Sequence, residues 1–179
     1  MNIPTITTPR LILRPFSETN VDPIYAILSE EGVLRYFPLS GPLTRERVDK
    51  MIARLLKHWE EHDYGLWAVI SRVTCDLLVR HGLQLIPKTG EVEIDFILGK
   101  PFWGQGFATE AAQASLCFGF DQVGIENIVG IIHPEYQASQ RVLEKLGMSL
   151  AEHTRYFGME VYRYTIDRSS WDSIGKRDR

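Results

Sequence analysis

The sequence contains few cysteines and no long apolar run. Only two of its 179 residues are cysteines, Cys75 and Cys117, and they form no Cys-x-x-Cys pair. Two such thiols cannot build a disulfide framework, so we expect packed side chains in a reducing cytoplasm. No stretch approaches the roughly 20 apolar residues that span a bilayer. Residues 1–16 lack the apolar core of a secretory signal. We therefore expect a cytoplasmic protein without a membrane partner.

The sequence also lacks an excess of basic charge. It has 20 Lys and Arg against 23 Asp and Glu, a formal net charge of −3. This balance argues against a general nucleic-acid surface and suits cationic partners slightly better. With 44% hydrophobic residues, the chain is long enough for one core and too short for two ordinary domains. We expect a single domain over residues 1–168 and a polar tail over residues 169–179, in a monomer or homodimer.

Apolar periodicity predicts the order of strands and helices in the first half of the chain. Residues 6–16 favour an edge strand, since Pro9 stands within them. Two amphipathic helices follow, the first beginning near Asn20 and the second capped by Thr44. Three strands then form an antiparallel meander, over residues 66–72, 77–86 and 91–98.

The second half alternates helix and strand. A helix over residues 108–120 precedes a strand over residues 127–133. The next helix carries Ala138, Val142 and Leu146 as its apolar stripe. A final hairpin is predicted over residues 150–157 and 160–167. This order indicates a mixed α/β (α+β) fold.

A glycine-containing loop connects the meander to the helix that follows it. It reads Trp103-Gly104-Gln105-Gly106-Phe107-Ala108-Thr109-Glu110-Ala111. The first backbone N–H groups of a helix have no helical partner, and the helix dipole adds roughly half a positive charge there. Glycines let a ligand approach the main chain closely, so a diphosphate fits this loop. A plain structural turn is the alternative.

Two nucleotide-binding motifs and one metal-binding motif match this sequence less well than a diphosphate loop does. A Rossmann loop needs Gly or Ala where Thr109 stands, and a Walker loop needs Gly-Lys-Ser/Thr, which is absent. The segment His58-Trp59-Glu60-Glu61-His62 matches the H-x-x-E-H pattern of a zinc peptidase. It lies on an amphipathic helix without an evident third ligand downstream. We favour a solvated helix end and expect no metal.

Several further segments accompany the loop in a fixed order. They are Thr8-Pro9-Arg10-Leu11-Ile12-Leu13-Arg14, Gly65-Leu66-Trp67-Ala68-Val69, Glu91-Val92-Glu93-Ile94, Ser139-Gln140-Arg141-Val142-Leu143-Glu144-Lys145-Leu146-Gly147-Met148 and Trp171. Together with the loop, they resemble the GNAT acetyltransferases, in the branch of the ribosomal-protein alanine acetyltransferases. The likeness extends from about Thr8 to Trp171.

The resemblance implies a strongly twisted mixed sheet that splays at its middle, with about four flanking helices and a C-terminal hairpin. Acetyl-CoA would lie in the splay as co-substrate. Main-chain groups of Phe96, Ile97 and Leu98 would pair with its pantetheine arm. The loop would hold its pyrophosphate through Trp103, Gly104, Gln105, Gly106, Phe107, Ala108 and Thr109. Trp103 replaces the Arg or Gln with which the family's loop usually begins.

Acetyl transfer to an amine requires a neutral amine, a stabilised oxyanion and a proton for the departing thiolate. Glu93 and Asp95 lie on the non-core face of the strand that alternation predicts, and are candidates for the base. A solvated face or a salt bridge is the alternative. A main-chain N–H near Phe96 or Ile97, exposed by a bulge, would meet the oxyanion.

The resemblance also indicates which side chain could protonate the departing thiolate. Ser139 matches the family's Asn-x-x-Ser serine and is a candidate proton donor or thiol contact, unless its hydroxyl only satisfies the helix start. Tyr136 replaces the Asn of that motif, and either supplies the acid or narrows the pantetheine channel.

The acceptor leaves no transferable signature. The implied reaction is direct attack by a primary amine in a ternary complex. The amine belongs to a protein or peptide α-amino group or to a small molecule. It would be bound by loops over residues 36–43 and 155–160, and the acidic face around Glu93 and Asp95 fits any cation. An acetyl-CoA-binding sensor or scaffold without turnover is the alternative function.

Overall fold

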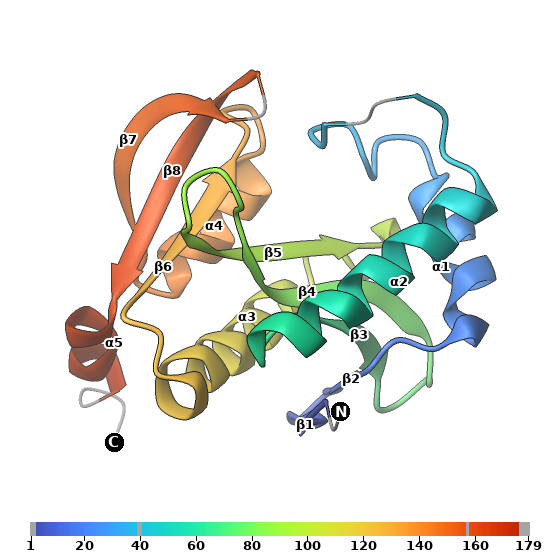
Figure 1. The fold of residues 1–179 in the computed structure, drawn as a ribbon, viewed down its shortest axis with the longest axis horizontal. Helices are drawn as coiled ribbons and strands as arrows, with labels where there is room; N and C mark the ends of the chain where they lie inside the picture. The colour runs from blue at the N-terminus through green and yellow to red at the C-terminus, as the bar shows by residue number, and fades with distance from the viewer. Residues whose placement is uncertain (1–2, 39–40, 157, 176–179) are drawn as a thin grey trace.

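A single eight-stranded sheet organises the chain (Figure 1). The computed structural model describes residues 3–38, 41–156 and 158–175. The strands are β1 (Ile6–Thr7), β2 (Leu11–Arg14), β3 (Leu66–Ser71), β4 (Leu77–Leu85), β5 (Val92–Leu98), β6 (Asn127–Ile132), β7 (Ser149–Tyr156) and β8 (Met159–Asp167). They lie in the order β1-β2-β3-β4-β5-β6-β8-β7, and every neighbouring pair is antiparallel except β5 and β6. The mixed sheet is therefore confirmed.

The splay lies between β5 and β6. These strands pair only through Val92 with Ile128 and Glu93 with Val129. Beyond these pairs β5 continues along β4 and β6 continues along β8. In Figure 1, β6, β7, β8 and α4 diverge from β5, α1 and α2. Residues 94–98 and 130–132 therefore bound an opening that no strand fills.

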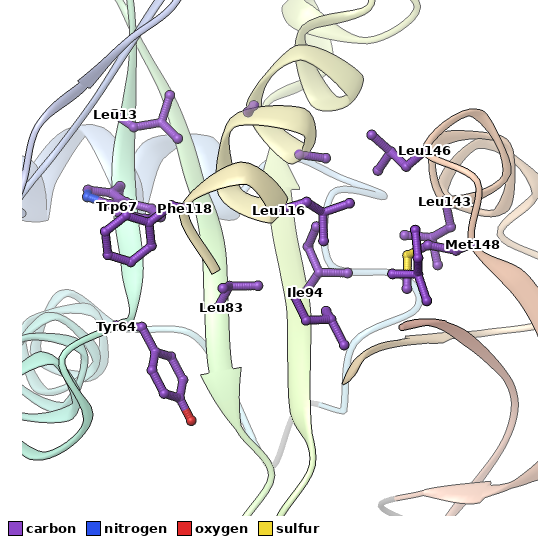
Figure 2. Packing of buried hydrophobic residues seen from close by; sticks show 14 of the residues in the cluster. Leu13, Tyr64, Trp67, Leu83, Ile94, Leu116, Phe118, Leu143, Leu146 and Met148 are labelled. Atoms are coloured by element: carbon purple, nitrogen blue, oxygen red, sulfur yellow. The ribbon is translucent and has the colours of Figure 1, made fainter. Parts of the chain in front are cut away.

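Helices cover both faces of the sheet. They are α1 (Val21–Leu28), α2 (Arg45–His62), α3 (Phe107–Cys117), α4 (Gln137–Lys145) and α5 (Arg168–Gly175). Alternation along β5 divides its side chains between two cores. Ile94 joins the larger core, which Leu116 of α3 and Leu143 of α4 complete, whereas Ile97 joins the core of α1 and α2. Figure 2 shows Leu116, Leu143 and Ile94 among the buried side chains of the larger core.

Most predicted boundaries are confirmed within a few residues. Thr44 caps α2, because its side chain accepts a hydrogen bond from the Arg47 N–H. This helix continues to His62. The predicted edge strand over residues 6–16 is instead two short strands, because the chain turns where the Thr8 N–H donates to the Leu11 carbonyl.

Two expectations about helices need correction. The tail expected from residue 169 begins as α5, because Trp171 is buried and stacks on Phe120 with ring centroids 5.5 Å apart. The described residues hold five α-helices, close to the expected number of about four; residues 176–179 lie outside them. Of the stripe predicted for α4, Leu146 is buried in the larger core and Val142 packs against that core, whereas Ala138 is exposed. The helix also buries Ser139 and Leu143. No helix of the described ranges has the length and apolar character needed to cross a membrane.

Candidate active site

The loop between β5 and α3 has the conformation that an anion site requires. Gly104 and Gly106 have φ angles of 72° and 80°, a region that favours glycine. The Glu110 N–H donates to the Gly106 carbonyl, which begins the helical ladder. The N–H groups of residues 107–109 precede that ladder and carry the positive end of the helix dipole.

Two side chains of the loop connect it to the segment before it. The Trp103 indole N–H donates to the Leu98 carbonyl at 2.7 Å, and the Gln105 amide donates to the Pro101 carbonyl at 2.6 Å. Trp103 therefore holds the loop against the end of β5. This contact gives a physical reason for tryptophan at a position where the family usually has Arg or Gln.

The N-terminal segment supports the same loop through Arg10. The Arg10 guanidinium donates to the Gln105 carbonyl at 2.8 Å, pairs with Glu110 at 2.6 Å and lies 4.5 Å from the Phe107 ring centroid. Thr8 also donates to Glu110, at 2.6 Å. Arg10 has no local sequence signal, since 95 residues separate it from Gln105. Its only signal was the resemblance carried by residues 8–14.

A cavity of about 390 Å³ extends from this loop along α4. Its α4 wall consists of Ala138, Arg141, Val142 and Lys145, which share one helix face. The remaining lining includes Phe96, Leu98, Phe102, Trp103, Gly104, Gly106, Phe107, Ala108 and Thr109. The groove thus joins an apolar strip to two cations and a helix N-terminus. This chemistry suits the pantetheine and phosphate groups of acetyl-CoA.

The pairing of β5 with β4 decides which of residues 96–98 have main-chain groups that face the splay. The Ile86 N–H donates to the Glu91 carbonyl and the Gly99 N–H to the Leu78 carbonyl, and the register between them is unbroken. Antiparallel alternation therefore directs the main-chain groups of Ile97 towards β4, and those of Phe96 and Leu98 towards the splay. The bulge expected in β5 is absent from this pairing, because the splay arises where β6 departs.

A second cavity, of about 420 Å³, lies on the other side of β5 and contains Glu93 and Asp95. Phe96, Tyr136 and Ser139 line both cavities. Residues on loops that were expected to bind the acceptor also line it, namely Tyr36, Phe37, Pro38, Leu43 and Met159. The two cavities meet at the splay, so a group held in one is adjacent to the other.

Glu93 and Asp95 belong to one polar cluster. Arg80 pairs with Asp95 at 2.7 Å, and the Gln84 amide donates to Glu93 at 2.9 Å and to Asp95 at 3.3 Å. The Ile131 N–H of β6 is also within hydrogen-bonding reach of the Glu93 carboxyl. Burial, and secondarily the charge of Asp95, raises the pKa of Glu93 to about 8. A carboxyl with such a pKa exchanges protons near neutral pH.

Tyr136 and Ser139 begin α4 at the junction of the cavities. Ser139 is buried, and its hydroxyl is within hydrogen-bonding reach of the Tyr136 phenol. Burial raises the pKa of Tyr136, which keeps the phenol protonated. Tyr36 stacks on both Tyr136 and His133, with ring centroids 4.9 Å apart in each pair. His133 also lines the second cavity.

His58 of the H-x-x-E-H segment has a structural role. One ring nitrogen contacts the Tyr64 carbonyl at 2.9 Å, and the other accepts from the Leu85 N–H at 3.0 Å. Both nitrogens are therefore engaged in joining the end of α2 to β4. Within the residues that the structure describes, no group of three His, Cys, Asp or Glu side chains could hold a metal ion.

Comparisons with known proteins agree with this geometry. Residues 10–149 match the family model described as an acetyltransferase (GNAT) domain. The uncharacterized N-acetyltransferase YnaD of Bacillus subtilis (strain 168) is 31% identical over 145 residues, covering 80% of this chain and 81% of that protein.

Two solved structures share the fold. The ribosomal-protein-S5-alanine acetyltransferase of Vibrio fischeri has a TM-score of 0.76 at 13% identity, over 93% of this chain and 98% of its own. The spermidine N-acetyltransferase of Vibrio cholerae, solved with CoA and spermine, has a TM-score of 0.75 at 16% identity, over 92% and 99%. From the family match, the splayed sheet and the loop, we conclude that the chain belongs to the GNAT acetyltransferase family.

Proposed function

We propose that the protein transfers the acetyl group of acetyl-CoA to a primary amine by direct attack in a ternary complex. The observation that carries this proposal is the meeting of two cavities at Phe96, Tyr136 and Ser139. One cavity has the chemistry of a CoA groove, and the other contains a carboxyl whose pKa suits proton transfer. An acyl donor and an amine held in these cavities would be adjacent.

Each requirement of the chemistry has a candidate group in this arrangement. Acetyl-CoA supplies an activated thioester when it is bound. Glu93 accepts the proton of the incoming ammonium, with Asp95 tuning its pKa. The Phe96 N–H, on the open edge of β5, donates to the acyl oxygen. Tyr136 protonates the departing thiolate, and Ser139 supports it by donating to the phenol oxygen.

The acceptor is a primary amine of a protein or peptide terminus or of a small molecule. The names of the two structural neighbours specify a protein alanine and a polyamine. Both acceptors are primary amines on a similar fold, so the fold leaves the choice open. That choice depends on the side chains of the second cavity.

Thiol release from acetyl-CoA, measured against a panel of peptides and small amines, tests the proposal. We expect amine-dependent release, with the acetylated amine identified by mass spectrometry. Thermal stabilisation by acetyl-CoA without turnover on any amine would instead support the sensor or scaffold function.

A further inference from the structure

One face of α2 brings two arginines to the second cavity. Arg47, Met51 and Arg54 line it, at positions i, i+4 and i+7 of the helix. They lie beside the buried stripe that begins at Val48. The Arg47 guanidinium donates to the Pro42 carbonyl at 2.6 Å, which places it beside the segment that precedes α2. In the described ranges, Arg54 has no ion pair with an acidic side chain.

The second cavity carries more positive charge than its two carboxyls alone would indicate. Its described lining holds three arginines against Glu93 and Asp95. Arg80 and Asp95 compensate each other at 2.7 Å. Glu93 is largely protonated at neutral pH, because its pKa is raised to about 8. Arg54, which has no ion pair among the described residues, therefore remains as positive charge in the wall of the cavity.

A second polar observation points the same way. The Arg80 Nε–H is buried and has no hydrogen-bond partner among the described residues. Arginine N–H groups are strong donors to carboxylate and phosphate oxygens. Arg80 thus adds a cationic side chain to the β4 wall of the cavity, with its Nε–H enclosed by the protein and Nη1 paired with Asp95.

The remaining walls are apolar and set the size of the acceptor. They include Leu28, Leu34, Phe37, Leu43, Met51 and Val161. A volume of about 420 Å³ falls in the range of small-molecule sites. It suits a compact molecule with an apolar part better than a long flexible polycation.

We infer that the acceptor is a compact amine that also carries an anionic group, a carboxylate or a phosphate, which Arg54 binds while the amine faces Glu93. The inference rests on the proposed function and specifies its substrate class. A polyamine is disfavoured, because its additional ammonium groups would meet the same arginine. Arg54 acts here as a specificity determinant at the acceptor cavity, outside the acetyl-CoA groove.

The test compares matched acceptors that differ only in the anion. Leucine and leucyl-alanine are each paired with the C-terminal amide, and 2-aminoethyl phosphate is paired with ethanolamine; spermidine completes the panel. We expect kcat/KM to favour the anionic member by about tenfold or more, the free-energy scale of one charge-assisted hydrogen bond. The carboxylate and phosphate arms identify which anion is used.

The variant Arg54→Met keeps the apolar stem of the side chain and removes its charge. We expect it to raise KM for the anionic acceptor about tenfold and to leave KM for acetyl-CoA and turnover of the amides unchanged. Lys57→Met is the matched control, because Lys57 is exposed on the same helix and pairs with Glu61 outside the cavity. Equal or better turnover of amides or spermidine would overturn the inference and leave acetyl transfer intact. Absence of thiol release with every amine would overturn the proposed function and the inference with it.

Discussion

Glu93 is predicted to control the pH dependence of turnover. Its pKa of about 8 means that most molecules lack the base at pH 7, so kcat/KM should rise through about pH 8. Glu93→Gln should lower kcat by about 100-fold and remove this rise. The measurement is kcat/KM against pH with one acceptor. A pH profile and rate unchanged in Glu93→Gln would exclude Glu93 as the base.

Asp95→Asn provides an internal control for the same pKa. The Asp95 charge raises the pKa of Glu93, so its removal should move the rise in kcat/KM to lower pH. Ionisation of the acceptor is identical in both enzymes, which isolates the side-chain contribution.

Unfolding supplies a second readout of the Glu93 pKa. Because the pKa of Glu93 is raised in the folded state, the free energy of unfolding of the protein falls as pH increases from 4.5 towards 8. Glu93→Gln should therefore resist unfolding better than the wild type above pH 8.

Tyr136 and Ser139 are predicted to contribute unequally. Tyr136→Phe removes the proposed proton donor and should lower kcat by about 100-fold. Ser139→Ala removes only the hydrogen bond to the phenol and should lower kcat by about tenfold or less. The pair is compared by single-turnover acetyl transfer at saturating acetyl-CoA. A larger loss in Ser139→Ala than in Tyr136→Phe would assign proton donation to the serine.

Some site residues were accessible from the sequence and others were not. Strand alternation placed Glu93 and Asp95 on the side opposite the larger core, and the structure brings both to one cavity. Arg10 and Arg54 had no local signal. Arg10 contacts a segment far away in the chain, and Arg54 lines a cavity whose other walls come from distant segments. Local patterns predict which way a side chain faces on its own element, and do not predict which distant element it meets.

At the scale of elements, periodicity predicted strands β3, β4 and β5 and helices α2, α3 and α4. It failed where packing between elements decides. The end of β5–β6 pairing after Glu93 depends on how α4 and β8 position β6, which periodicity does not encode. The stripe of Ala138, Val142 and Leu146 looked like a core face. Leu146 is buried in the larger core, whereas Ala138 and Val142 line the groove. An apolar groove for a ligand and an apolar core have the same sequence signature.

The support of the loop by the N-terminal segment makes a prediction at this scale. Arg10→Gln removes the pair with Glu110 and the hydrogen bond to Gln105. The Arg10 side chain is 44% exposed, so solvent screening reduces the effect. We expect acetyl-CoA affinity to fall by about tenfold or less, with little change in kcat at saturation. Calorimetric titration with acetyl-CoA measures this change.

Arg45→Gln is the matched control for the Arg10 variant. Arg45 pairs with Asp22, both side chains are highly exposed, and the pair lies outside the loop. Its removal should leave acetyl-CoA affinity unchanged. Unchanged affinity in Arg10→Gln as well would show that Gly104 and Gly106 hold the loop without help from the N-terminal segment.

At the scale of the whole molecule, the packing of α3 on the central strands encloses one histidine. His81 of β4 is fully buried between Phe96, whose ring stacks on it at 5.1 Å, and Ser115 of α3, whose hydroxyl lies 3.1 Å from Nδ1. Ser115 donates its own proton to the Ala111 carbonyl. The His81 Nδ1–H therefore donates to Ser115, and Nε2 is an acceptor without a partner among the described residues.

This environment predicts a stability loss in acid. Burial, and secondarily the charge of Arg80, lowers the pKa of His81 from 6.5 to about 3. The unfolded chain then binds the proton more readily, so stability is complete above pH 6.5 and declines as pH falls towards 3. At about pH 4.5 the loss should be about 3 kcal/mol. His81→Phe keeps the stacking on Phe96 and removes the titration. Urea unfolding of both proteins from pH 7 to pH 4.5 should therefore give a steeper decline in stability for the wild type. Parallel declines would mean that the pKa of His81 is the same in the folded and unfolded states.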